Sequence, residues 1–276
     1  MIVFPNCKIN LGLRILEKRN DGYHNIETVF YPIALSDILE VTEYIDSHKT
    51  ATIPFTRSGF FIDGDLGNNL CIKAYKLLKR DFPKLPYVQM HLHKSVPTGA
   101  GLGAGSSDAA FTLKLLNEKF SLGLSDKELM AYALELGSDC PFFILNKPCY
   151  ATGRGEILEP IELDLSAYKF VLVNPGIHIN TGRAFLKVSS SKPDKRIPQI
   201  LEMPVERWKD HLLNDFEKIA FQEFSEIVDI KDQLYVAGAL YASMSGSGST
   251  LYGIFKKETE ISLSFPSHYF VKELDS

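Results

Sequence analysis

The sequence predicts an α+β fold made of two domains. Strand-like alternation of apolar residues dominates residues 8–56, and helical spacing appears from Asn68. After Pro160 the pattern changes, and fewer strands are expected. The 276 residues suffice for one large domain or for two modest ones. We place the domains at 1–160 and 161–276, although composition alone does not force this division.

Composition restricts the classes of partner. A hydrophobic content of 45% and a charged content of 23% are ordinary for a globular protein. The net charge of −4 argues against nucleic acid and membrane surfaces as partners, but it allows a local basic pocket for phosphates. The residues Met1 to Pro5 lack the basic start and cleavage pattern of a signal peptide, no apolar run is long enough for a bilayer, and there is no C-x-x-C pair. We therefore expect a cytoplasmic protein with free thiols. No interface signature appears, and a monomer or a weak homodimer is expected.

The first half of the chain alternates between strands and helices. On the first expected strand, Ile9, Leu11, Leu13 and Ile15 share one face. The expected strands cover residues 8–17, 27–35, 38–45, 51–56 (weaker), 87–93, 142–145 and 156–161. The expected helices begin at Asn68 or Asn69 as N-cap, at Ala109, and at Ser125, where a capping-box pattern opens a helix that Gly137 closes.

The second half has fewer strands. We expect strands at 170–173 and 251–255, a short helix capped by Thr181 and reaching Val188, a polar loop at 189–195, and helical patterns over 205–233. Ser245-Gly246-Ser247-Gly248 is a second glycine turn, which by itself is equally typical of a hairpin.

Glycines are concentrated in the stretch between Val96 and Ala110, which reads VPTGAGLGAGSSDAA. Glycine loses more conformational entropy on folding than any other residue, so their density requires a cause. Backbone that approaches a ligand closely, followed by the N-terminus of a helix, is typical of a phosphate site. A flexible linker fits poorly, because Leu102 lies among the glycines and amphipathic segments flank them.

Two common phosphate signatures do not fit this stretch. A Walker loop has Lys directly after its last glycine, where this chain has Ser106. The G-x-G-x-x-G dinucleotide pattern fails in both registers, since Ala104 and Ser106 stand where the third glycine belongs.

Three further sites carry groups suited to catalysis or to ligand binding. Asp139 lies between a helix end and the apolar Pro141-Phe142-Phe143 segment, so we expect it to be partly buried, either as a cap of local N–H groups or as a general base. Lys8 and Asn10 share the polar face of the first strand, where lysines are usually just solvated. The turn Asp21-Gly22-Tyr23-His24 offers a ring surface for a ligand, although a Tyr-His pair in a loop is more often only exposed.

Together these motifs resemble those of the GHMP kinases. The stretch Pro97 to Ala110 is similar to their phosphate-binding motif, and Met244 to Gly248 corresponds to their third motif. Lys8-Ile9-Asn10-Leu11, Gly22-Tyr23-His24 and Gly137-Ser138-Asp139 resemble the branch that acts on a cytidine-diphosphate-linked methylerythritol. The resemblance implies a ribosomal-protein-S5-like N-terminal domain, a ferredoxin-like C-terminal domain and an active site in the cleft between them.

The resemblance also implies roles for individual residues. Asp139 is the expected base that acts on the C2 hydroxyl, and Lys8 steadies the developing alkoxide. ATP is the expected co-substrate with Mg²⁺, which Ser106 or Ser107 contacts. The expected ATP-binding residues are Pro97, Thr98, Gly99, Ala100, Gly101, Leu102, Gly103, Ala104, Gly105, Ser106, Ser107, Lys94 and Asn69. The small-molecule substrate is expected to contact Asn10, Tyr23, His24, Thr181 and Phe185, with Phe185 stacking on cytosine opposite Tyr23.

Two alternatives remain. Another GHMP kinase, with a mevalonate- or homoserine-type substrate, would keep the glycine stretch but is disfavoured by the Asp21–His24 turn. A non-catalytic nucleotide-binding relative would be expected to have lost Lys8 or Asp139, and both are present.

Overall fold

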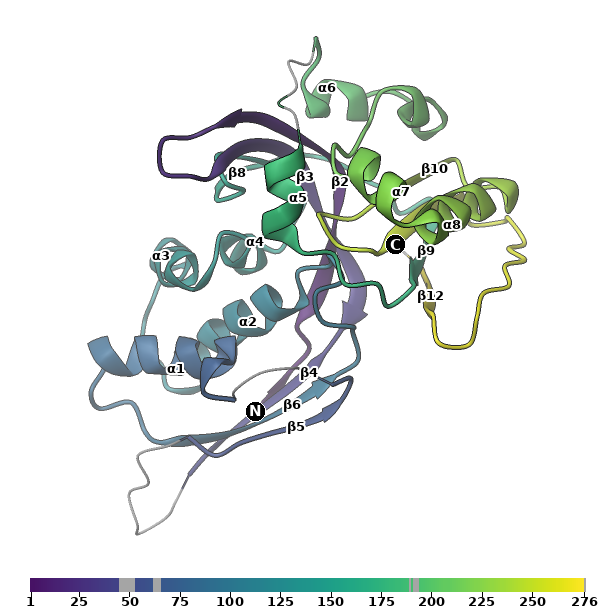
Figure 1. Ribbon diagram of the computed structural model, residues 1–276. Coiled ribbons are helices and arrows are strands. Elements are labelled where there is room, and N and C mark those ends of the chain that lie inside the picture. Colours follow the sequence, from purple (N-terminus) through teal and green to yellow (C-terminus); the bar gives the residue numbers. More distant parts are fainter. Residues whose placement is uncertain (45–52, 62–65, 189, 191–193, 276) are drawn as a thin grey trace. The chain divides into compact units, whose positions relative to one another are not determined.

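The computed structural model describes residues 1–44, 53–61, 66–188, 190 and 194–275 (Figure 1). The chain forms two compact units, each assembled from separate segments. The first unit comprises Met1–Cys7, Leu35–Thr98 and Gly103–Asn146, and the second comprises Lys8–Ala34, Gly99–Leu102 and Lys147–Ser276. The domain boundary expected at residue 160 stays a prediction.

A four-stranded sheet forms the base of the first unit. Its order is β1 (Ile2–Val3), β4 (Ile38–Glu43), β6 (Val88–Lys94) and β5 (Phe55–Gly59), with β5 parallel to β6 and the other pairs antiparallel. Leu39 pairs with Leu92 and Val41 with Met90, and all four side chains are buried. The alternation predicted for these strands is therefore confirmed, because one face of the sheet is apolar.

Helices cover one side of this sheet (Figure 1). They are the 3-10 turn η1 (Leu66–Asn68), α1 (Leu70–Asp81), α2 (Ala104–Lys119), α3 (Asp126–Leu136) and α4 (Cys140–Leu145). Asn69 caps α1 by accepting the Cys71 N–H at 2.9 Å, and Ser125 and Glu128 form the expected capping box of α3.

The second unit contains two four-stranded sheets. One has the order β2 (Asn6–Lys18), β3 (His24–Ser36), β7 (Cys149–Thr152) and β8 (Ile157–Pro160). The other has the order β10 (Tyr241–Met244), β11 (Leu251–Lys256), β9 (Tyr168–Asn174) and β12 (Phe270–Asp275), and all its pairs are antiparallel. The remaining elements are α5 (Thr181–Lys187), α6 (Ile197–Leu201), η2 (Val205–Asp210), α7 (Glu217–Glu223) and α8 (Ser225–Val236).

The apolar core of the second unit lies where α8 packs on the second sheet. Ile230 and Leu234 from α8 join Met244, Leu251 and Phe255 from β10 and β11 in one buried cluster. This cluster fixes the end of β10, from which the second glycine turn begins. None of the helices in the described part of the chain combines the length and apolar character needed to cross a bilayer.

Several expected elements differ from the observed ones. Residues 142–145 were expected to be a strand but belong to α4, where Pro141 occupies the first turn. Helix α2 begins at Ala104 rather than Ala109, since the glycines and serines are part of its first turns. Helix α5 is capped by Asn180, one residue before the expected Thr181.

The other differences concern breaks and the limits of the described residues. The helical region 205–233 is interrupted between η2 and α7, at residues 211–216. Residue 45, residues 51–52 of the weak strand and residues 189 and 191–193 of the polar loop lie outside the described residues.

Candidate active site

The first half of the glycine stretch is part of the second unit, and its backbone bonds there are extensive. The Leu102 carbonyl accepts the Lys8 N–H at 3.0 Å, and the Gly101 carbonyl accepts the Ser245 hydroxyl at 2.8 Å. The Ala100 carbonyl accepts the Thr250 N–H at 3.4 Å. These bonds use carbonyl oxygens, so they fix the segment without consuming its N–H groups.

Gly101 and Gly248 allow two backbones to pack directly against each other. A Cβ on Gly101, at φ +83°, would lie 2.0 Å from the Ser245 carbonyl oxygen, and one on Gly248 would lie 2.4 Å from Ala100. Neither site can hold a side chain. The turn Ser245–Gly248, expected to be a third motif or a plain hairpin, therefore supports residues 99–102 within this unit.

Lys8 and Asn10 are buried on β2 rather than solvated, with exposed fractions of 3% and 2%. The Lys8 ammonium donates to Asn10 Oδ1 at 2.5 Å and lies 4.6 Å from the centroid of the Phe30 ring. Asn10 Nδ2 donates to the Thr28 hydroxyl at 3.0 Å. The Asn10 amide thus orients Lys8, a function that the polar-face expectation did not include.

The second half of the glycine stretch begins helix α2 of the first unit. Gly103 is its N-cap at φ +69° and provides no side chain to cap the first N–H groups. A Cβ on exposed Gly105 would meet nothing within 4 Å. The first turn of this 16-residue helix is therefore open and rich in N–H donors, an arrangement that suits an anion such as phosphate.

Ser106 and Ser107 differ in accessibility. Ser107 is completely buried, and its hydroxyl has no hydrogen-bond partner among the described residues. Ser106 is half-buried. An unpaired buried hydroxyl is costly, so it marks a place where a ligand or an ordered water would supply a partner. Across the described residues, no group of three or more His, Cys, Asp and Glu side chains is arranged to hold a metal.

Lys94 is buried between two carboxylates of the first unit. It pairs with Asp37 and, at 2.8 Å, with Asp108 on α2. Asp37 also accepts the N–H groups of Ser95 and Val96, at 2.7 and 3.1 Å. Burial raises the pKa of the Asp108 carboxyl, and Asp37 raises it further. The cluster connects the end of β6 to α2, and no sequence pattern singled out either aspartate.

Asp139 stands at the N-cap of α4 and is half-buried, as expected from its position before an apolar segment. Its side chain makes no capping hydrogen bond to α4. The capping role that the sequence left open is therefore not used on this helix.

The expected substrate-binding rings lie in the second unit. His24 and Phe185 stack on each other, with centroids 5.2 Å apart and planes inclined by 21°. Tyr23 is 55% exposed, and the guanidinium of Arg154 lies 4.8 Å from its ring centroid. Thr181 shares a 2.9 Å hydroxyl contact with Ser247 of the second glycine turn.

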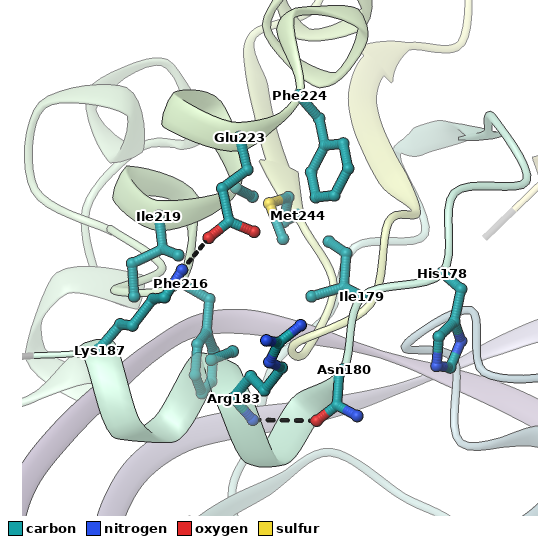
Figure 2. Close-up of a pocket in the computed structure, with 12 residues that line it drawn as sticks. His178, Ile179, Asn180, Arg183, Lys187, Phe216, Ile219, Glu223, Phe224 and Met244 are labelled. Atoms are coloured by element: carbon teal, nitrogen blue, oxygen red, sulfur yellow. Dashed lines mark hydrogen bonds and ion pairs between the residues drawn. The ribbon is translucent and has the colours of Figure 1, made fainter.

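A separate cavity of about 140 Å³ lies beside α5 and α7 (Figure 2). Ile179, Phe216 and Met244 contribute apolar walls, while Lys187 and Glu223 pair with each other at its edge. None of the expected site residues lines this cavity. We therefore do not assign the expected chemistry to it.

Sequence reasoning missed a polar segment that the fold uses heavily. Asn214 and Asp215 lie between η2 and α7, and Glu217 is the first residue of α7. Each bonds to a distant part of the second unit, with Asp215 accepting the Ile15 N–H at 2.8 Å. The sequence signal that could have indicated this segment is the set of three polar residues that flank Phe216, whose side chain is buried.

Comparison with known proteins identifies the family. The family model for the GHMP kinases N terminal domain matches residues 69–147, and the model for the GHMP kinases C terminal domain matches residues 197–264. The 4-diphosphocytidyl-2-C-methyl-D-erythritol kinase of Bacteroides fragilis is 51% identical over 95% of this chain and 94% of its own length. The enzyme of the same name from Azobacteroides pseudotrichonymphae is 52% identical over 93% and 94%.

A solved structure agrees with these relatives. A crystal structure of 4-(cytidine 5'-diphospho)-2C-methyl-D-erythritol kinase is 32% identical, with a TM-score of 0.76, and the match covers 92% of this chain and 90% of the other. The chain belongs to the GHMP kinases and, within them, to the family of these 4-diphosphocytidyl-2-C-methyl-D-erythritol kinases.

Proposed function

We propose that the protein transfers the γ-phosphoryl group of ATP to the C2 hydroxyl of 4-diphosphocytidyl-2-C-methyl-D-erythritol, giving the 2-phosphate and ADP. This is a step of the non-mevalonate route to isoprenoids. The observation that carries the proposal is the 51% identity to a kinase of this name over 95% of the chain. A mevalonate- or homoserine-type substrate is less well supported, because the relatives that are 49–52% identical to this chain are all named as 4-diphosphocytidyl-2-C-methyl-D-erythritol kinases.

The proposed ATP site uses backbone more than side chains. The N–H groups of Gly99 to Leu102 and of the first turn of α2 suit the phosphates, because the bonds that fix Ala100 to Leu102 use carbonyl oxygens and the first turn of α2 has no side-chain cap. The fold excludes a side chain at Gly101, whereas a Cβ at Gly105 would meet no neighbour. Pro97, Thr98 and Ala104 complete this stretch. Lys94 supports the glycine stretch through its ion pair with Asp108. Asn69, which caps α1, is proposed to contact ATP at the edge of this stretch.

Exposure distinguishes the two serines as metal contacts. The Ser107 hydroxyl is wholly buried, whereas Ser106 is half-buried, so we propose Ser106 as the contact for Mg²⁺. Magnesium prefers oxygen ligands and retains several waters, so one hydroxyl together with the ATP phosphates is a sufficient set.

The proposed chemistry requires one proton acceptor and one cation. When bound, ATP with Mg²⁺ supplies the phosphoryl group and neutralises charge on the phosphates. Asp139 accepts the C2 hydroxyl proton, and the ammonium of Lys8, fixed by Asn10, stabilises the oxygen from which that proton leaves. A tertiary alcohol is a weak nucleophile, so holding it beside a carboxylate is useful.

The proposed cytidyl contacts are Asn10, Tyr23, His24, Thr181 and Phe185. His24 and Phe185 already stack on each other, and Phe185 also packs edge-on against Phe216, so these contacts hold the two rings in place at little further entropic cost. We further propose that the enzyme works in the cytoplasm. We propose that it is a monomer or a weak homodimer, and light scattering at two protein concentrations would check this oligomeric state.

A coupled assay of ADP release tests this function. Purified protein with Mg²⁺ and ATP is offered the cytidyl substrate, mevalonate and homoserine in parallel. We expect turnover of the cytidyl substrate alone, with phosphorus NMR placing the new phosphate on C2. Turnover of mevalonate or homoserine without the cytidyl substrate would contradict the proposal.

A further inference from the structure

We propose that Asn214 and Glu217 are positioning residues for nucleotide binding. They fix the end of β10 and the turn Ser245–Gly248, and this turn supports the backbone of Gly99–Leu102. The inference rests on the proposed function, because it assigns those backbone groups to the ATP phosphates.

Asn214 fixes the turn from one side. Its Nδ2 donates to the carbonyls of Met244, at 2.9 Å, and Gly246, at 2.8 Å, while Oδ1 accepts the Phe216 N–H at 3.0 Å. The side chain is buried, and all three available bonds agree with one orientation of the amide. The reversed amide would place an oxygen against two carbonyl oxygens, so the contact is specific to Asn.

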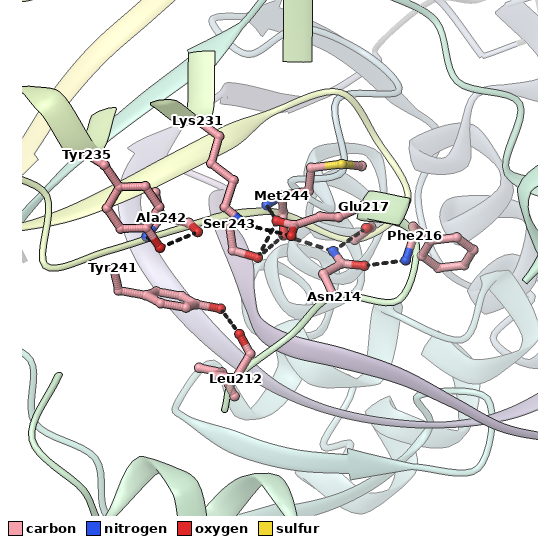
Figure 3. A network of polar contacts seen from close by, with 11 residues as sticks. Leu212, Asn214, Phe216, Glu217, Lys231, Tyr235, Tyr241, Ala242, Ser243 and Met244 are labelled. Atoms are coloured by element: carbon pink, nitrogen blue, oxygen red, sulfur yellow. Dashed lines mark hydrogen bonds and ion pairs between the residues drawn. The ribbon is translucent and has the colours of Figure 1, made fainter. Parts of the chain in front are cut away.

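Glu217 fixes the preceding strand residues from α7 (Figure 3). Its Oε1 accepts the Met244 N–H at 2.8 Å and the Ser243 hydroxyl at 3.0 Å, and Oε2 pairs with Lys231 of α8 at 2.7 Å. A buried carboxylate is tolerated only when it is paired and hydrogen-bonded, and this one is fully used. Both polar groups of the Met244 backbone are therefore held by side chains from outside the sheet.

Ser245, which follows Met244, is in close contact with Gly101 and Asn10. The Ser245 hydroxyl donates to the Gly101 carbonyl at 2.8 Å and accepts the Asn10 N–H at 3.3 Å. The site of a Cβ on Gly101 is only 2.0 Å from the Ser245 carbonyl oxygen. Because the two backbones are in direct contact, a displacement of Met244 and Ser245 is passed to residues 100–102.

The chain provides a matched control on the same helix. Glu223 also lies on α7 and also pairs with a lysine, Lys187, but it is more exposed and has no bond to β10 or to the turn. A general effect of losing a carboxylate or an ion pair from α7 would appear in both positions. An effect through the turn would appear only at Glu217.

The test compares Glu217→Ala, Glu217→Gln, Asn214→Asp and Glu223→Ala with the unmodified protein. Calorimetry with a non-hydrolysable ATP analogue and Mg²⁺ gives the nucleotide Kd, and kinetics give KM for ATP and for the alcohol. We expect Glu217→Ala to weaken nucleotide binding about tenfold, the order of one lost charged hydrogen bond, with KM for the alcohol nearly unchanged. Gln retains an acceptor for Met244, so Glu217→Gln should recover most of the affinity.

Asn214→Asp keeps the side-chain volume but loses the donors to two carbonyls, so it should weaken nucleotide binding even if Glu217→Ala fails to fold. Glu223→Ala should bind as the unmodified protein does. Unchanged nucleotide affinity in folded Asn214→Asp and Glu217→Ala would overturn the inference, as would an equal loss in Glu223→Ala. An unmodified protein that binds nucleotide but does not phosphorylate the alcohol would overturn the proposed substrate alone, and one that binds no nucleotide would overturn both proposals.

Discussion

Lys8 shows how a single side chain depends on its neighbours. A lysine on an alternating strand is usually solvated, but both faces of β2 are buried from Cys7 to Ile15. Removing an ammonium from water is costly, and Asn10 Oδ1 and the Phe30 ring face compensate for part of that cost. The sequence predicts that Lys8 and Asn10 share a face, but burial of that face depends on distant segments.

Asp139→Asn is expected to reduce turnover strongly. The amide keeps the shape of the side chain but is not basic enough to accept the hydroxyl proton, so kcat should fall about 10²–10⁴-fold. Affinity for the ATP analogue should change little, because the proposed phosphate contacts are backbone groups. Asp126→Asn, an exposed aspartate in the first turn of α3, is the control. Steady-state kinetics and calorimetry measure both effects, and full activity in Asp139→Asn would remove it as the base.

At the scale of elements, the contact between Gly99–Leu102 and the turn Ser245–Gly248 allows a prediction about stability. Gly101→Ala should lower the free energy of unfolding through both left-handed strain and a clash with the Ser245 carbonyl. Gly176 has a similar φ, +78°, with nothing within 4 Å of a Cβ, so Gly176→Ala should cost only the strain, about 1–2 kcal/mol. Denaturant unfolding of the two variants measures the difference, and equal losses would show that the packed turns tolerate a methyl group.

Helix α1 permits the two roles of Asn69 to be separated. Asn69→Ala should destabilise the protein by about 1 kcal/mol, since the helix loses the acceptor for the Cys71 N–H. Asn69→Ser keeps a capping oxygen and should retain stability. Asn68→Ala, at an exposed neighbouring position, is the control for thermal unfolding. A raised KM for ATP in Asn69→Ser at unchanged stability would support the proposed nucleotide contact, whereas a destabilised Asn69→Ser would contradict a purely capping effect on stability.

The elements differ in how far the sequence predicts them. Strong periodicity predicts β6, α1 and α3 with small shifts at their ends. The run Phe142–Leu145 is too short for its periodicity to distinguish a helix from a strand. Pro141, in the first turn of α4, was the overlooked signal of a helix. The glycine stretch is visible in the sequence, but its support by Asn214 and Glu217 is not, because their partners lie about 30 residues further along the chain.

At the scale of the whole molecule, the cysteines allow a prediction about reactivity. All four are buried thiols rather than disulfides, and burial raises the pKa of Cys71, of Cys140 to about 12 and of Cys149 to about 11. The thiolate is the reactive form, so the native protein should react with an aromatic disulfide reagent only slowly at pH 8. Four thiols should react rapidly after unfolding in guanidinium. A rapid phase in the native protein would contradict the burial of at least one thiol.

The interleaved segments of the second unit have a consequence for its synthesis. The Ile15 N–H is bonded to Asp215, 200 residues later, and the Leu13 N–H to the Leu213 carbonyl. A ribosome adds roughly 5–20 residues per second, so β2 emerges many seconds before these partners exist. During that time its apolar face, which the finished protein buries, needs either temporary contacts within the nascent chain or a chaperone. Slow codons after β2 should therefore lower the yield of soluble protein more than slow codons after Asp215.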